Sequence, residues 1–310
     1  MKKTSKTPLI SVIIPFFNTG LSLEGLIKQI SKICPDAEII CVDDKSTDGS
    51  LARIKKLAND KVHVIAQKKN QGSAAARNRG ITEAKGKYIV FLDSDDFIRD
   101  DFFEKMLSCI NEAALGVCGI RQIFLKDNKF VDKFTKEPKA RNPKDNWREY
   151  ILKSMFNGAE LYSSVNKIYL GDVIRENDLR FDEKLNFAED TKFVLDYLAC
   201  FDDDAKINFV CEPLYFYNYG TNTSVVADSS LRWKNWQKSY DDIIAWLGRE
   251  NDGGSRVISR RELRLAKKLR TRFKISHLLA VTRSKKSREE KLKYVNKFEL
   301  LLGELALKIR

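Results

Sequence analysis

The stretch NQGSAAARNRGITEAKGKYIVFLDSDD, residues 70–96, joins a helix-forming segment to an apolar strand that ends in acids. The alanine-rich part predicts a helix that Gly86 ends, and KYIVFL predicts a buried strand. Three carboxylates, Asp93, Asp95 and Asp96, then stand within four positions. Because like charges so close repel each other, we expect a positive partner at the tip of this strand.

The segments before this stretch show the same alternation. LISVIIPFF, AEIICVDD and KVHVIAQ are apolar runs rich in β-branched residues and predict strands. LSLEGLIKQISKI and STDGSLARIKKLAND carry apolar residues at helical spacing, with Ser46 and Thr47 as candidate N-caps of the second helix. This order predicts an α/β fold, a mostly parallel sheet with helices on both faces.

Ligands of such sheets bind at the carboxyl ends of the strands. Asn18, the Asp43–Asp44 pair and the acids of residues 93–96 each follow a strand, so three strands should deliver polar groups to one edge. Hard divalent cations such as Mg²⁺ and Mn²⁺ favour a few carboxylate oxygens plus phosphate oxygens, which suits Asp93 and Asp95. Asp96 fits N-terminal capping of the next helix equally well.

Several other kinds of site are excluded. There is no G-x-x-x-x-G-K-[ST] phosphate loop and no G-x-G-x-x-G after the first strand. A haloacid-dehalogenase-type D-x-D loop would have Thr or Val where Phe97 stands, on the first strand rather than the fourth. With only two histidines, the sequence argues against a zinc site or a histidine-based triad, and the six cysteines form no C-x-x-C pair. Reduced cysteines of this kind predict a cytoplasmic protein.

The pattern changes after residue 97. DFFEKMLSCINEAAL, NWREYILKSMFN and TKFVLDYLACF predict helices, VCGIRQIFL predicts a strand, and INFVCEPLYFYNY predicts a strand pair or a strand and turn. The polar residues 126–146 predict a loop or an excursion from the sheet. From Leu231 onward the chain is predicted to be helical, and an apolar stripe along its last helix must bury against something, for example a second copy of the chain.

The basic character of the protein belongs to its C-terminal region. Residues 229–310 hold 22 of the 56 Lys and Arg but only 9 of the 43 Asp and Glu, so the whole formal net charge of +13 lies there. This asymmetry predicts an anionic partner such as a membrane surface, nucleic acid or acidic polymer, and a solvated helical face is the alternative. No apolar run is long enough to span a membrane, and Pro15 interrupts the N-terminal one, which we interpret as a strand.

Five segments together resemble family-2 glycosyltransferases with the GT-A fold. SVIIPFFN, EIICVDDKSTDGS and the stretch quoted above match the donor-side motifs in order, and NKIYLGDVIRENDLRFDEKLNFAED and PLYFYNYGTNTSVV match acceptor-side segments of bacterial polymer-building members. The resemblance covers about residues 8–228 and departs at Phe17, where Tyr is more frequent, and at Lys45, where Gly is usual. It implies a nucleotide-sugar-binding half over 1–97 and an acceptor-binding half over 98–228. It does not cover the basic helical region that composition and pattern predict over 229–310.

The resemblance also implies a role for each matching residue. Pro15 and Asp44 should help hold the nucleotide base, with Asp44 accepting a hydrogen bond from a ring N–H, and Asn70 and Arg77 should complete the base and phosphate pocket. Asp93 should contact the ribose or the metal's water, and Asp95 should ligate a metal that bridges the diphosphate. The expected nucleotide-sugar-binding residues are Pro15, Phe17, Asn18, Asp44, Asn70, Arg77, Asp93 and Ser94, with Asp95 and Asp93 as metal ligands. The two asparagines also fit turn-forming roles.

On the acceptor side, the resemblance implies that Asp190 is the general base of an inverting displacement. Glu189 should orient or support the acceptor, and Lys167 should approach the donor phosphate or the acceptor, unless its role is structural. Capping of the helix that starts with EDTKF is an alternative role for Asp190. A single displacement requires one base and no enzyme nucleophile.

The sequence therefore predicts an inverting glycosyltransferase that depends on Mn²⁺ or Mg²⁺. It would move a sugar from a nucleotide-sugar, in the first place a UDP-sugar, to a saccharide, polymer or lipid-linked acceptor in cell-surface polysaccharide biosynthesis. We expect a cytoplasmic protein, with possible peripheral contact of its basic helices with an anionic membrane or homo-oligomers formed through them. The rival functions are a nucleic-acid-binding protein, of which no module is visible, and a nucleotidyltransferase, whose glycine- and arginine-rich first loop is absent.

Overall fold

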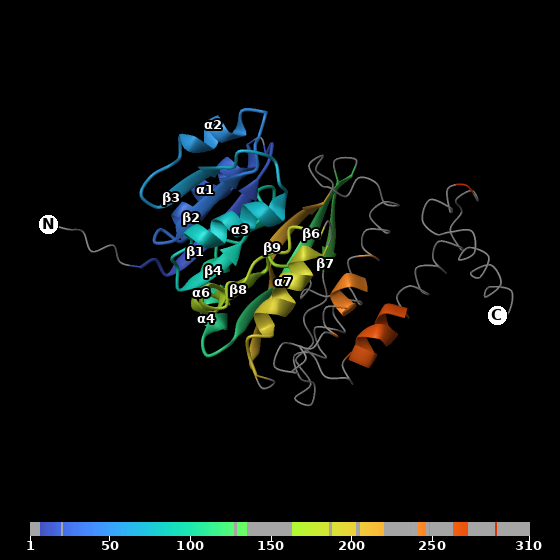
Figure 1. Cartoon of the computed structure of the whole chain (residues 1–310). Coiled ribbons are helices and arrows are strands. Elements are labelled where there is room, and N and C mark those ends of the chain that lie inside the picture. The colour runs from blue at the N-terminus through green and yellow to red at the C-terminus, as the bar shows by residue number, and fades with distance from the viewer. Residues whose placement is uncertain are drawn as a thin grey trace. The chain divides into compact units, whose positions relative to one another are not determined.

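The computed structural model in Figure 1 describes most of the first two thirds of the chain and parts of the rest. The described residues are 7–19, 21–126, 129–134, 163–185, 188–202, 205–219, 238, 241–245, 248, 263–271 and 289. The chain divides into two compact units, of which the first comprises Met1–Trp147, Ala159–Lys184 and Glu189–Ser224 and the second includes Val225–Arg310. Our division into 1–97, 98–228 and 229–310 stays a prediction.

The first part of the sheet has the predicted alternation of strands and helices. Its elements are β1 (Ile10–Phe16), α1 (Ser22–Ile33), β2 (Glu38–Asp43), α2 (Ser50–Lys55), β3 (Val62–Ala66), α3 (Ser73–Glu83) and β4 (Tyr88–Phe91). Strand β1 lies between β2 and β4 and is parallel to both, and β3 is parallel to β2. This part of the prediction is confirmed, and because its four strands are parallel, their carboxyl ends meet at one edge.

The second part of the sheet is mixed. Its elements are β5 (Phe97–Ile98), α4 (Phe102–Ile110), β6 (Leu115–Lys126), β7 (Lys129–Phe134), β8 (Lys167–Leu170), α6 (Gly171–Glu176), α7 (Glu189–Leu198) and β9 (Ile207–Tyr219). The strand order is β3-β2-β1-β4-β8-β6-β9-β5, with β7 paired to β6. Strand β8 is antiparallel to β4 and β6, whereas β9 is parallel to β6.

Two predictions for this part are corrected. Residues 126–146, which we expected to form a loop or an excursion from the sheet, contain strand β7, which pairs with β6 in an antiparallel hairpin. The rest of that predicted loop lies outside the described residues, as does NWREYILKSMFN. INFVCEPLYFYNY is one strand rather than a pair, and its irregularity is a shift of register against β6 around Gly119.

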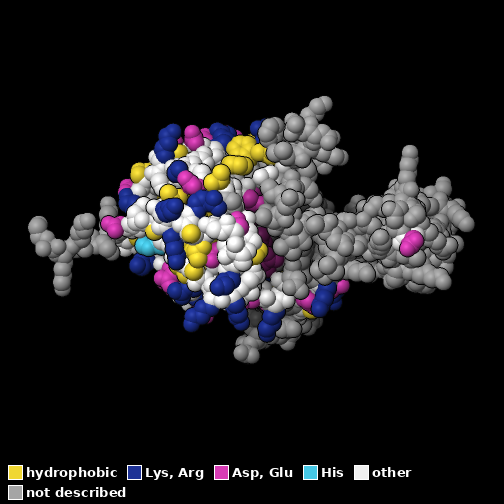
Figure 2. Space-filling model, turned by 90° about the horizontal axis from the view of Figure 1, so that it is seen from above, with side chains coloured by type: hydrophobic (Ala, Val, Ile, Leu, Met, Phe, Trp, Pro, Cys, Tyr) yellow, Lys and Arg dark blue, Asp and Glu magenta, His cyan; other side chains and the backbone are white. Residues whose placement is uncertain are grey.

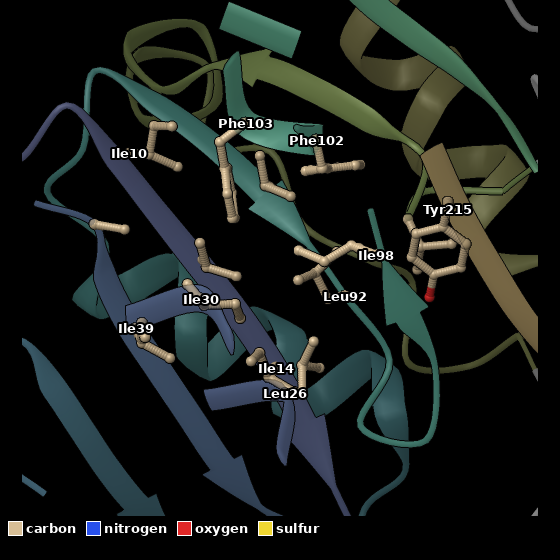
Figure 3. Packing of buried hydrophobic residues seen from close by; sticks show 14 of the residues in the cluster. Ile10, Ile14, Leu26, Ile30, Ile39, Leu92, Ile98, Phe102, Phe103 and Tyr215 are labelled. Atoms are coloured by element: carbon tan, nitrogen blue, oxygen red, sulfur yellow. The ribbon is translucent and has the colours of Figure 1, made fainter. Parts of the chain in front are cut away.

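Helices cover both faces of the sheet. Figure 3 shows one buried cluster, in which Ile14 of β1 and Leu92 lie near Leu26 of α1 and Phe102 of α4. Because side chains alternate along a strand, Phe91 points to the opposite face. There its ring packs edge-on against three other aromatic rings at centroid distances of 5.2–5.6 Å, those of Phe181, Phe193 and Tyr169.

Two local expectations about helix ends are also wrong. Helix α2 begins at Ser50 after Gly49, so Ser46 and Thr47 do not cap it. Helix α3 ends at Glu83, three residues before Gly86. A Cβ on Gly86 would come within 2.4 Å of the backbone nitrogen of Ser11, so this glycine is required where two backbones approach closely.

In the second unit, residues 241–245 and 263–271 are helical, which agrees with the predicted C-terminal helical region as far as it is described. Arg270 forms an ion pair of 2.8 Å with Asp241. The predicted apolar stripe from Leu292 onward lies outside the described residues. Among the helices that the structure describes, none has the length and apolar character needed to cross a membrane.

Candidate active site

The carboxyl ends of β1 and β2 are joined by polar side chains. Strands β1 and β2 end in register, Phe16 beside Asp43. Asn18 then accepts a hydrogen bond of 2.8 Å from the backbone N–H of Thr47, and its own N–H donates to the hydroxyl of Ser46 at 3.0 Å. Asn18 therefore shapes the turn, which is one of the roles that we left open for it. The same bonds give Ser46 and Thr47 a place in this turn, whereas we had expected them to cap a helix.

Asp44 fixes the loop that leads into α3. Its two carboxylate oxygens accept hydrogen bonds of 2.8 Å each from the backbone N–H groups of Gln71 and Gly72. Gly72 has a φ of 90°, which favours glycine. Each carboxylate oxygen can accept a second bond, so this structural role is compatible with the predicted contact to a nucleotide base. Around it, Pro15 is buried in β1, whereas Phe17 and Asn70 are exposed.

The acidic stretch after β4 is a tight turn. The N–H of Asp96 donates to the carbonyl oxygen of Asp93 at 3.2 Å, which places the four residues in a β-turn. Ser94 and Asp96 are buried, and Asp93 and Asp95 are half-buried. Asp96 does not cap the following helix, since α4 begins only at Phe102. Its carboxylate instead accepts hydrogen bonds from β9.

The positive partner expected at this turn is Arg77, from α3. One guanidinium nitrogen lies 2.7 Å from Asp93, and the other lies 3.2 Å from Asp190 and 3.7 Å from Glu189. The guanidinium carbon also lies 5.3 Å from the ring centroid of Phe181. With only 3% of its surface exposed, Arg77 joins the acids of the β4 turn to those of α7.

Burial and mutual repulsion shift the pKa values in this cluster. Burial raises the pKa of Glu189 to about 7, the Asp190 carboxylate adds to this, and Arg77 opposes it. Burial also raises the pKa of Asp93, against the effect of Arg77. Burial alone would lower the pKa of Arg77, but Asp190, Asp93 and Glu189 outweigh it and raise that pKa. The cluster thus holds one cation that stays charged among three acids, one of which titrates near neutrality.

Asp190 is oriented by two hydrogen bonds to the same oxygen. The hydroxyl of the fully buried Ser164 donates to Asp190 Oδ1 at 2.7 Å, and Arg77 donates to it at 3.2 Å. No hydrogen bond from the described residues reaches Oδ2. Asp190 stands in the first turn of α7, where the helix dipole favours a carboxylate. The arrangement presents one oxygen of a fixed carboxylate for a proton transfer.

Lys167 lies in the sheet rather than at the mouth of the site. It is fully buried in β8, and its ammonium donates to the carbonyl oxygen of Ser163 and, at 2.8 Å, to the amide oxygen of Asn166. Asn166 in turn donates to the carbonyl oxygen of Cys118. This geometry favours the structural role that we left open for Lys167.

Three residues that contact the site were not predicted from the sequence, namely Ser164, Tyr215 and Asn218. The structure brings Ser164 to Asp190 from 26 positions away, and it brings Tyr215 and Asn218 to the β4 turn from about 120 positions away. The tyrosine-rich segment was noted only for its resemblance. No spacing rule connects residues so far apart. Knowledge of the β5–β9 pairing could have identified Tyr215 and Asn218, and no comparable signal points to Ser164.

As a metal site, the β4 turn offers two carboxylates. Within the described part of the chain, no group of three or more His, Cys, Asp or Glu side chains is placed to hold a metal ion. Mg²⁺, however, is commonly held by one or two carboxylates together with substrate phosphates. Asp93 and Asp95, partly exposed at the carboxyl edge, fit such an incomplete set, which a diphosphate would complete.

Comparisons with known proteins identify the family and the fold of the chain. The family model described as glycosyl transferase family 2 matches residues 11–174. The EpsH protein of Bacillus subtilis is 28% identical over 251 residues, which is 79% of this chain and 71% of EpsH. The succinoglycan biosynthesis protein ExoO of Rhizobium meliloti is 27% identical over 199 residues, 63% of this chain and 57% of ExoO.

Among solved structures, the fold is similar to that of TarS from S. aureus. The crystal structure of its residues 1–349 superposes with a TM-score of 0.65 at 18% identity, over 95% of this chain and 80% of that one. The same segment of TarS in complex with UDP-GlcNAc gives a TM-score of 0.63 at 19% identity, over 93% and 78%. These similarities confirm the predicted GT-A fold.

Proposed function

The chain belongs to glycosyl transferase family 2 and is a glycosyltransferase, and we propose that it moves a sugar from a UDP-sugar to a carbohydrate or lipid-linked acceptor. The observation that carries the proposal is the Arg77 cluster. Through it, Asp93 of the turn after β4 and Asp190 of α7 contact one guanidinium, at 2.7 and 3.2 Å. A donor held at the turn would therefore lie within reach of a base on α7.

The comparisons support the choice of donor and pathway. TarS has been solved with UDP-GlcNAc, and the name of ExoO places that protein in succinoglycan biosynthesis. We propose by analogy a UDP-sugar as donor and cell-surface polysaccharide biosynthesis as the process. The rival functions, nucleic-acid binding and nucleotidyl transfer, gain no support from the geometry of the site.

The proposed chemistry is a single displacement with inversion. Asp190 accepts the proton of an acceptor hydroxyl on Oδ2, the oxygen that receives no hydrogen bond from the described residues. The hydroxyl oxygen forms a bond to the anomeric carbon as the bond from that carbon to the diphosphate oxygen breaks on the opposite face. The diphosphate leaves with the electron pair, so no covalent enzyme intermediate is required. General base catalysis of this kind contributes about 10²- to 10⁴-fold to a rate.

Asp95 and Asp93 are the residues that would hold Mn²⁺ or Mg²⁺. Such a cation, when bound, would offset the negative charge that develops on the leaving diphosphate. Arg77 fixes the orientation of Asp93 by their ion pair, and Asp44 holds the loop of Gln71 and Gly72 beside the expected base pocket. We keep Pro15, Phe17, Asn18, Asn70 and Ser94 as proposed nucleotide-sugar contacts and Glu189 as acceptor support.

A nucleotide-sugar panel tests the proposal. Thermal shifts with UDP- and other nucleotide-sugars, with and without Mn²⁺, should single out a UDP-sugar whose stabilisation requires the metal. Sugar transfer to a polysaccharide acceptor should then follow with inverted configuration at the anomeric carbon, as NMR of the product would show. Absence of any response to nucleotide-sugars, or a product of retained configuration, would refute the mechanism.

Two substitutions separate the proposed roles. The Asp95→Asn variant should no longer respond to the metal and should lose most of its affinity for the donor, while its fold stays intact. Asp190→Asn should bind UDP as the unchanged protein does and lose transfer by about 10²- to 10⁴-fold. A fully active Asp190→Asn variant would disprove its role as base.

We propose that the basic C-terminal region docks the enzyme on an anionic membrane surface. On the helix of residues 263–271, Arg264, Lys267 and Lys268 are exposed and lie at spacings of three and four. By contrast, Figure 2 shows basic and acidic side chains interspersed over the visible described surface. Charge reversal of these three residues should weaken sedimentation with phosphatidylglycerol vesicles but not UDP binding. Equal sedimentation, or a change of oligomeric state alone, would contradict the proposal.

A further inference from the structure

Strand β9 holds the turn that carries Asp93 and Asp95. The fully buried Tyr215 donates its hydroxyl hydrogen to Asp96 Oδ2, and the backbone N–H of Asn218 donates to Asp96 Oδ1 at 2.8 Å. The N–H of Asp93 donates to the hydroxyl oxygen of Tyr215 at 3.3 Å, and the side-chain amide of Asn218 donates to the carbonyl oxygen of Asp95 at 3.4 Å. The bonds reach Asp93, Asp95 and Asp96, so the turn is held along most of its length.

The position of Tyr215 follows from strand pairing. The short strand β5 comes directly after Asp96 and pairs antiparallel with β9, with Phe97 opposite Phe216 and Ile98 opposite Tyr215. Figure 3 shows Tyr215 extending from β9 near Ile98 and Leu92. The residue next to the turn is therefore locked to β9, and the tyrosine hydroxyl lies between the first and last residues of the turn.

We propose that Tyr215 is a positioning residue for donor binding, which acts through Asp96 to set the direction of the Asp93 and Asp95 carboxylates. This inference rests on the proposed function, because it assumes that these two carboxylates meet the donor diphosphate and its metal. The three acids then divide into two outward groups and one inward anchor. Since Asp96 already accepts bonds from Tyr215 and Asn218, the anchor orients the turn and is not itself a metal ligand.

The division explains why three acids can stand together. The negative charge of Asp93 is compensated by the guanidinium of Arg77 at 2.7 Å. The carboxyl group of Asp96 instead accepts hydrogen bonds from two donors on β9. Two hydrogen bonds, one to each oxygen, fix the position of the Asp96 carboxyl group. Loss of the tyrosine hydroxyl would leave Asp96 with one donor fewer in a buried site, and the turn could then rotate its outward carboxylates away from the ligand.

Tyr215→Phe tests the proposal, because it deletes the hydroxyl and keeps the ring. In the full-length protein, the dissociation constant of UDP measured by calorimetry in saturating Mn²⁺ should rise about tenfold, which corresponds to ~1.4 kcal/mol. The Mn²⁺ concentration for half-maximal transfer and the KM for the donor should rise by a similar factor, with a much smaller change in kcat. This split distinguishes positioning of the donor from a general loss of structure.

Tyr197→Phe is the matched control. Tyr197 is also fully buried, and its hydroxyl donates to the carbonyl oxygen of Ala114 and accepts from the N–H of Leu170, so it makes no bond to the turn. This variant should lose thermal stability and bind UDP as the unchanged protein does. Equal UDP and Mn²⁺ affinities for the two tyrosine variants would overturn the positioning role.

The Asn218→Ala variant provides a second test of the inference if the Tyr215→Phe variant does not fold. It removes the amide contact to the carbonyl oxygen of Asp95 but leaves Tyr215 and the backbone N–H in place, so a rise of about threefold in the dissociation constant of UDP is expected. An unchanged value would overturn the inference. The proposed function fails separately, if the unchanged protein neither binds UDP nor responds to Mn²⁺.

Discussion

The two parts of the sheet present their polar residues in different ways. In the parallel part, β1 to β4, several candidate residues come from the loops that directly follow a strand, as Asn18, Asp44 and Asp93 do. In the mixed part, Asp190 stands at the start of α7, Ser164 precedes β8, and Tyr215 lies inside β9. The polar residues of the parallel part are thus brought together mainly by the loops that follow consecutive strands. Those of the mixed part are brought together by contacts between segments that are distant in the sequence.

This difference shows what joins the two parts. Arg77 belongs to α3 of the parallel part, yet two of its three acidic partners lie on α7. Tyr215 belongs to the mixed part, yet its hydroxyl holds the turn that ends β4. The candidate active site is therefore cross-linked by one ion-pair cluster and one hydrogen-bond network, each of which crosses from one part to the other.

Arg77→Ala should have the largest effect, because it would break the link between the two parts. Three acids would remain around a buried space without their cation, and removal of one partner of a buried pair costs about 3–5 kcal/mol. We expect a loss of that size in the free energy of unfolding by urea, together with loss of transfer. Arg77→Lys should recover part of the stability, since a point charge replaces the planar fork.

Arg79→Ala is the control for that experiment. Arg79 lies two positions further along α3 and pairs with Glu83 on the surface, with both side chains over 40% exposed. It should change the free energy of unfolding by less than about 0.5 kcal/mol. Similar losses for both arginine variants would show that the cluster contributes no more than a surface pair.

The same comparison explains which features the sequence could predict. Continuous apolar runs that alternate with helical periods specify a parallel sheet, and the geometry of such a sheet specifies the edge where the following residues meet. The order from β1 to β4, the carboxylates after β4 and the start of α7 were all predicted in this way. The requirement for a positive partner was also predicted. Its assignment to a metal stays a prediction, and the structure shows Arg77 beside Asp93.

The sequence could not predict contacts that depend on the pairing of distant strands. The segment that contains β7 is polar overall, so it was interpreted as a loop or an excursion from the sheet. Asp96 was left between two roles because nothing near it in sequence indicates a donor on β9. Lys167 was considered for the donor or the acceptor on the resemblance, and its structural partners, Ser163 and Asn166, become clear only in three dimensions.

Ser164→Ala should have an intermediate effect and sharpens the comparison of the two parts. It removes the neutral donor that fixes Asp190 Oδ1 and leaves Arg77 as the remaining donor. A hydrogen bond to a charged group contributes about 1.5–3 kcal/mol, so kcat should fall about tenfold or more, with the dissociation constant of UDP unchanged. Ser164→Thr, which keeps the hydroxyl, should restore part of the rate.

The control for this variant comes from the parallel part. Ser11 is fully buried like Ser164, and its hydroxyl donates to Glu38 at 2.5 Å and accepts from the N–H of Gly86. Ser11→Ala should lower the melting temperature and leave kcat nearly unchanged. If kcat falls equally in both serine variants, Ser164 stabilises the fold and does not orient the base.

Glu189→Gln should have the smallest effect, and it appears as a change in pH dependence. The pKa of Glu189 is raised from 4.5 to about 7 by burial and by Asp190. The folded protein therefore keeps a proton that the unfolded chain loses between these values, and stability falls as the pH rises from about 4.5 to 7. Glutamine cannot ionise, so the Glu189→Gln variant should gain on the order of 1 kcal/mol relative to the unchanged protein at pH 8 and nothing at pH 4. Urea unfolding at both pH values measures the difference in the free energy of unfolding between the two proteins. If this difference is the same at both pH values, Arg77 keeps Glu189 ionised. The charge of Glu189 would then belong to the ion-pair cluster that links the two parts.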